Sequence, residues 1–145
     1  MSVSSTVLPG IPDSVAAARA FVVECLRSTP GSTVPDELVE RAELITSELA
    51  TNAVRHTRSG DPGGSYEVRV EVDRSEIRAE VRTREPRTPH TAPHVLPHAG
   101  DPCRATGRGL FLVDLLATRW GGLATPAEGV YFVLRWPDRP YPVRA

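Results

Sequence analysis

The segment SELATNAVRH, Ser47 to His56, carries three polar side chains at intervals of four residues: Glu48, Asn52 and His56. On a helix, this spacing produces a slowly drifting line, because four residues overshoot one turn by about 40°. Glu48 and Asn52 each directly precede an apolar residue, so the line borders the face that the helix buries. A carboxylate and an amide one turn apart can share a water molecule or a Mg²⁺ ion, since both offer oxygen ligands. A solvated helix flank explains the same spacing, and spacing alone favours that simpler interpretation.

A second candidate site lies in ATGRGLFLVDLLA, where Thr106, Gly107, Arg108 and Gly109 lead directly into an apolar helical segment. A glycine turn at a helix N-terminus presents unpaired N–H groups to an anion, and an arginine adds a planar donor fork. All 17 basic residues of the chain are arginine, so a phosphate contact has to come from arginine, backbone N–H or a metal. A glycine hinge feeding a packed helix fits this segment equally well.

Three histidines, His90, His94 and His98, also recur every four residues, in PHTAPHVLPH. On a helix this would be a metal-ligand spacing. Pro93 and Pro97 each precede a histidine and would break such a helix. Residues 85–106 hold five prolines and no periodicity, so we expect a long loop that acts as a lid or is disordered.

The elements that would position these side chains follow from hydrophobic periodicity. Residues 1–12 are expected to form an extended arm, and residues 138–145 a proline-bearing tail. One helix begins near Asp13, and a second begins near Pro35 with Leu38, Ala42, Ile45, Leu49 and Ala53 as its buried stripe. Strict alternation predicts an antiparallel hairpin, with strands over Tyr66–Asp73 and Ile77–Arg84. A short helix over Leu110–Ala117 and strands near Trp120–Ala124 and Val130–Trp136 complete the order.

Helices and antiparallel strands are largely segregated in this order, which favours an α+β fold. We expect a two-layer sandwich with a mixed, mostly antiparallel sheet and helices on one face. The length of 145 residues fits one domain, over residues 13–137. The net charge of −1 argues against a general nucleic-acid binder.

The chain lacks a signal-peptide pattern at its start and any apolar run of transmembrane length. The two cysteines, Cys25 and Cys103, define no disulfide or zinc framework. We therefore expect a cytoplasmic protein without membrane contact.

Together, ELITSELATNAVRH and TGRGLFLVDLLATRWG resemble the N box and the second glycine box of the GHKL ATPase/kinase superfamily. The pattern is similar to the small stand-alone branch of anti-sigma-factor serine kinases of the RsbW and SpoIIAB type, in the form abundant in actinobacteria. The resemblance covers roughly Ser14 to Trp136. It implies a Bergerat (HATPase) fold, an ATP·Mg²⁺ site between helices and sheet, and a lid over about residues 85–109.

Carried over by position, the resemblance implies that Glu48 is the catalytic base and that Asn52 holds Mg²⁺. His56 resembles the terminal N-box residue near the phosphates or the lid. The second glycine box would close on the phosphates with Thr106, Gly107, Arg108, Gly109 and Leu110. The first glycine box departs from the family pattern, because Thr83 stands where an aspartate usually binds the adenine amino group.

The loss of a hydrogen bond to a charged acceptor costs about 1.5–3 kcal/mol, which weakens binding roughly 10- to 150-fold. The Thr83 hydroxyl can still accept from the amino group, so selectivity for the base should suffer most. Alternatively, Glu85 takes the role if the end of the strand shifts.

The resemblance implies an ATP-dependent serine/threonine protein kinase that sequesters a sigma factor and phosphorylates a STAS-type antagonist. It also implies that homodimers are common in this branch. The alternative is a non-catalytic Bergerat-fold protein that regulates its partner by sequestration, with weak or absent ATP binding. Glu48 favours the kinase, because a pure binding module needs no base, and Thr83 favours the alternative.

Overall fold

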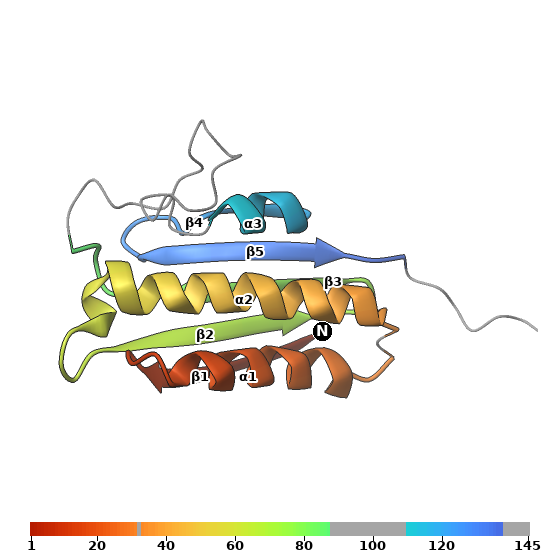
Figure 1. The fold of residues 1–145 in the computed structure, drawn as a ribbon. Helices are drawn as coiled ribbons and strands as arrows, with labels where there is room; N and C mark the ends of the chain where they lie inside the picture. The colour runs from red at the N-terminus through yellow and green to blue at the C-terminus, as the bar shows by residue number, and fades with distance from the viewer. Residues whose placement is uncertain (32, 88–109, 138–145) are drawn as a thin grey trace, which may run out of the picture.

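The protein forms one five-stranded antiparallel sheet covered on one face by helices (Figure 1). The structure is a computed structural model that describes residues 1–31, 33–87 and 110–137. The strand order is β1-β2-β3-β5-β4, and every neighbouring pair is antiparallel. The strands are β1 (Ser2–Pro9), β2 (Ser65–Val72), β3 (Glu76–Arg82), β4 (Arg119–Gly122) and β5 (Gly129–Arg135). The helices are α1 (Ser14–Ser28), α2 (Asp36–His56), the 3₁₀ turn η1 (Arg58–Gly60) and α3 (Leu110–Leu116). This architecture confirms the α+β sandwich expected from the sequence.

The central hairpin forms because β2 and β3 alternate apolar and charged residues. Val68 faces Val81 and Val70 faces Ala79 across the ladder, and all four side chains are buried. The charged residues between them are only half-buried on the opposite face of the sheet. Successive side chains point to opposite faces of a strand, so one face receives the helices and the other stays charged.

Helix α2 lies across the middle of the sheet and supplies the core residues Ile45, Leu49 and Ala53. Leu38, expected in the same stripe, is only half-buried, and Val39 is buried instead. The buried face of α2 is wider than the predicted stripe, because α2 packs against α1 as well as against the sheet. Ala50 is also fully buried for this reason.

The expected N-terminal arm is a strand of the sheet. Residues 2–9 pair with β2 along their whole length, from Ser2 opposite Val72 to Pro9 opposite Ser65. Alternation did not predict this strand because its side chains, SVSSTVLP, are mostly small and mixed on both faces. Pro9 is acceptable at the end of an edge strand, where the missing N–H breaks no central ladder.

None of the helices in the described part of the chain is long and apolar enough to cross a membrane.

Candidate functional site

A small pocket lies where α2, the end of β3, the start of α3 and the start of β5 meet. Its apolar lining comes from Leu49, Ala53, Val81, Pro86, Leu110 and Val130. The pocket encloses about 30 Å³. Since one water molecule needs about 10–15 Å³ by this kind of measure, the pocket has room for about two waters in this conformation.

Three residues singled out in the sequence meet in this pocket, although they come from three separate elements. Asn52 of α2, Thr83 after β3 and Leu110 of α3 all line it. Asn52 is buried, with 8% of its surface exposed, and Leu110 is almost fully buried. An amide this well covered, on the wall of a mostly apolar pocket, is placed to orient a polar ligand.

Glu48 lies one turn before Asn52 on α2 and is half-buried, but it does not line the small pocket. Burial raises the pKa of its carboxyl group above the ordinary glutamate value, and the positive charge of Arg55 partly offsets that rise. Partial desolvation of this kind makes a carboxylate a stronger base. The sequence did not single out Arg55, although its place seven residues after Glu48 sets it on the same flank of the helix.

His56 is the last residue of α2 and is half-buried. Its backbone oxygen accepts a hydrogen bond of 3.0 Å from the N–H of Arg87. This contact places the segment after β3 directly against the end of the helix.

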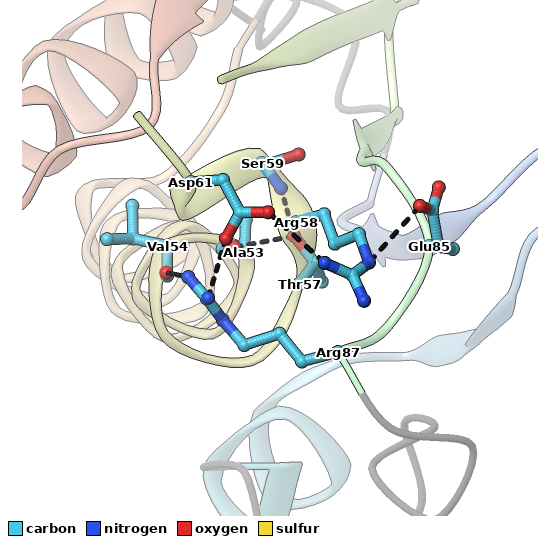
Figure 2. A network of polar contacts seen from close by, with 8 residues as sticks. All are labelled: Ala53, Val54, Thr57, Arg58, Ser59, Asp61, Glu85 and Arg87. Atoms are coloured by element: carbon cyan, nitrogen blue, oxygen red, sulfur yellow. Dashed lines mark hydrogen bonds and ion pairs between the residues drawn. The ribbon is translucent and has the colours of Figure 1, made fainter. Parts of the chain in front are cut away.

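Glu85, the alternative partner for an adenine amino group, does not line the pocket. Its carboxylate lies 3.5 Å from Arg58 Nε, and its carbonyl oxygen accepts a hydrogen bond from the Arg58 N–H (Figure 2). Thr83, in contrast, borders the pocket, and its N–H donates to the carbonyl oxygen of Glu128 at 3.0 Å. Of the two residues considered for an adenine contact, Thr83 lies at the pocket and Glu85 does not.

The second glycine box, with Thr106, Gly107, Arg108 and Gly109, lies outside the described residues, as do His90, His94 and His98. Within the described ranges, no group of three or more His, Cys, Asp or Glu side chains could hold a metal ion. A Mg²⁺ ion bound together with a nucleotide does not need such a cluster, because it uses one or two protein oxygens plus phosphates and waters. The side-chain oxygens of Asn52 and Glu48 are of the type that fits this role.

Glu128 and Gly129 line the same pocket, and periodicity did not mark either of them. Gly129 has a φ of 131°, and a Cβ there would collide with the carbonyl oxygen of Val81. A glycine directly before an apolar strand run was the one signal in the sequence that could have indicated this close approach.

A protein-family model described as a histidine kinase-like ATPase domain matches residues 8–121, well over half of the chain. The chain belongs to this family. The matched region runs from the end of β1 to β4 and includes every pocket residue except those of the turn into β5. No curated protein matches the chain.

Membership in this family confirms the expected superfamily and implies an ATP-binding domain. The lining agrees with that assignment in its chemistry, since ligand sites combine apolar walls with a few polar groups, but at about 30 Å³ the pocket in this conformation is smaller than a purine ring. The family match does not distinguish the anti-sigma branch from other members, so that assignment remains a prediction.

Proposed function

We propose that the protein is an ATP-dependent serine/threonine protein kinase that phosphorylates a STAS-type antagonist and holds a sigma factor inactive. The observation that carries the proposal is the arrangement on α2, where Asn52 lines the pocket and the half-buried Glu48 precedes it by one turn. Burial raises the pKa of the Glu48 carboxyl group, and perturbed carboxyl groups of this kind are typical of catalytic bases, which supports the kinase over a domain that only binds nucleotide.

In the proposed reaction, the hydroxyl oxygen of the antagonist attacks the γ-phosphorus of ATP. The bond from that phosphorus to the β,γ-bridging oxygen breaks, ADP leaves, and the hydroxyl proton passes to the Glu48 carboxylate. Phosphoryl transfer depends mainly on positioning and on neutralising charge. When bound, Mg²⁺ would neutralise the phosphates, and the Asn52 side-chain oxygen would help to hold it there.

The nature of the partners rests on the sequence resemblance to the RsbW and SpoIIAB type. The same resemblance supports a homodimer and a cytoplasmic location as parts of the proposal.

The test is to incubate the purified protein with Mg²⁺·ATP and candidate STAS proteins, and to locate any phosphate by mass spectrometry. The parent protein should phosphorylate one serine or threonine of its cognate antagonist, and the Glu48→Gln variant should lose at least about 100-fold in rate. Equal transfer by the two proteins would remove Glu48 from the mechanism. Binding of ATP without transfer to any candidate would favour the second function below.

The second candidate function is a non-catalytic protein that regulates its partner by sequestration. Two observations favour it: Thr83 supplies no carboxylate for an adenine amino group, and the pocket encloses only about 30 Å³. This function predicts that Glu48→Gln and the parent protein bind a sigma factor equally well, with or without ATP.

A further inference from the structure

The chain directly after β3 is fastened to the end of α2 and to η1 by a compact set of polar contacts (Figure 2). The guanidinium group of Arg87 donates to Asp61 Oδ1 at 2.6 Å and reaches the carbonyl oxygen of Val54 at 3.5 Å. The second carboxylate oxygen of Asp61 lies 3.4 Å from Arg58 Nη1. Asp61 therefore lies between two arginines, one from η1 and one from the segment after β3. We call the pair Asp61 and Arg87 the clamp.

Backbone contacts run beside the clamp and hold the same segment. Thr57 and Pro86 form an antiparallel bridge, flanked by the hydrogen bonds from Arg58 N–H to the Glu85 oxygen and from Arg87 N–H to the His56 oxygen, both 3.0 Å. The N–H of Arg84 also donates to the hydroxyl of Ser59, which is fully buried, at 2.9 Å. Residues 84–87 thus form a short ladder with residues 56–59, from the last residue of α2 into η1.

Gly60 of η1 leaves space for the side chain of Arg87. A Cβ at Gly60 would collide with the carbonyl oxygen of Val54 and would lie 2.9 Å from Arg87 Nη2. The glycine therefore leaves the space in which the Arg87 guanidinium approaches the helix end. Cationic groups are favoured at this place, because the last carbonyl groups of a helix carry partial negative charge.

The ladder fixes one wall of the candidate nucleotide pocket. Thr57 and Pro86, its bridged pair, both line the pocket, and so does Thr83, which directly precedes the ladder. The clamp itself does not line the pocket, and its side chains are only partly covered, with 30% of Asp61 and 40% of Arg87 exposed. Any effect of the clamp on a ligand therefore has to act through the wall that it holds.

We propose that Asp61 and Arg87 are positioning residues for the nucleotide base: they order the wall, formed by Thr83 and Pro86, that the bound base would contact. The proposal rests on nucleotide binding, the first step of the proposed function, and does not require phosphoryl transfer. Loss of the clamp should weaken nucleotide binding and leave the core intact, because none of its side chains belongs to the hydrophobic core.

The test uses the full chain and titrates Mg²⁺·ATP and Mg²⁺·ADP by calorimetry into the parent, Asp61→Asn, Arg87→Gln and the double variant. Each single change should raise both Kd values by about three- to tenfold, as expected for a partly exposed ion pair that orders a binding wall. The double variant should weaken binding by less than the product of the two single effects, because both changes break the same ion pair between Asp61 and Arg87. Where transfer is measurable, KM for ATP should rise with kcat unchanged.

The matched control is Arg41→Gln, which removes an ion pair of 2.8 Å to Glu37 on the far end of α2, with 41% of the arginine exposed. It should leave both Kd values unchanged while shifting the melting temperature as little as the clamp variants do. Amide hydrogen exchange without nucleotide gives a second readout, since the N–H groups of Arg84 and Arg87 should exchange faster in Asp61→Asn than in the control.

The possible results distinguish the proposed function from the positioning role of the clamp. A parent protein that binds neither nucleotide would overturn the proposed function and the positioning role with it. A parent protein that binds, together with clamp variants that bind equally well, would overturn the positioning role alone. If Asp61→Asn does not fold, Arg87→Gln decides the question by the same two criteria.

Discussion

The proposed function of Glu48 opposes the stability of the fold, because a base has to be ionised and the folded protein disfavours the ionised form. Burial raises the pKa of its carboxyl group, which means that the folded protein disfavours the charged form that a base requires. Because the folded-state pKa lies above the unfolded one, any stabilisation from this group is present below the unfolded pKa and is lost as pH rises through the folded pKa. At neutral pH the ionised carboxylate therefore weakens the fold.

The Glu48→Gln variant should consequently melt at the same temperature as the parent protein or slightly above it at pH 7.5. That advantage should vanish at about pH 3, well below the ordinary glutamate pKa of about 4.3, where the glutamate of the parent is protonated in both states. Thermal melts at both pH values, with the exposed Glu40→Gln as control, measure the effect. A variant that melts well below the parent at pH 7.5 contradicts the account of a desolvated base.

Thr83 lines the pocket and is the residue that we propose contacts the base of the nucleotide. The Thr83→Asp substitution restores a charged acceptor at the end of β3 and should lower the Kd for ATP by about tenfold or more, with a smaller effect on GTP. Thr83→Val, which keeps the shape and removes the hydroxyl, should bind ATP more weakly than the parent. Calorimetric titration of the three proteins with both nucleotides gives the comparison. Similar ATP affinity in the Asp and Val variants would remove position 83 from base recognition.

Asn52 could be placed from the period of its helix and the resemblance to the N box, and Thr83 from the alternation of its strand; both line the same pocket. Glu128 and Gly129 could not be, since a turn has no period. The ion pair between Asp61 and Arg87 could not be predicted from the sequence for a related reason. Arg87 is 26 residues away along the chain, and no local pattern links the two.

The start of β5 constrains the wall of the pocket through its backbone. Gly129 combines a φ of 131° with a Cβ position that would collide with the Val81 carbonyl oxygen on the neighbouring strand. We expect Gly129→Ala to destabilise the fold by about 2–3 kcal/mol, because strain and collision act together.

Urea unfolding measures this cost, and Gly122→Ala provides the matched control. Gly122 lies on the edge strand β4, where a Cβ would come no closer than 3.9 Å to its nearest neighbour. The control should change the unfolding free energy by less than about 0.5 kcal/mol, as is usual for surface substitutions. Equal effects of the two substitutions would show that the backbone at Gly129 is not constrained.

The helices and the central hairpin could be predicted almost to their ends, because α2 and β2 each bury one face and their apolar residues repeat at the matching period. The strand β1 was predicted only as an extended arm. Its position depends on pairing with β2, more than fifty residues later in the chain, and its small polar residues carry no strong alternation. Long-range pairing is the information that a local pattern does not contain.

In the whole molecule, α2 and α3 pack on the same face of the sheet. This arrangement brings the two helices together with the end of β3 and the start of β5. The sheet and α2 share a continuous core around Ile45, Phe132 and Val70. The family match agrees with this architecture and makes nucleotide binding the claim on which the other proposals depend.

The most direct test of that claim is a calorimetric titration of the parent protein with Mg²⁺·ATP, accompanied by thermal melts at rising nucleotide concentration. We expect saturable binding at one site. The melting temperature should rise with nucleotide concentration by the amount that the measured Kd predicts. Absence of heat, together with an unchanged melting temperature at millimolar Mg²⁺·ATP, would contradict it.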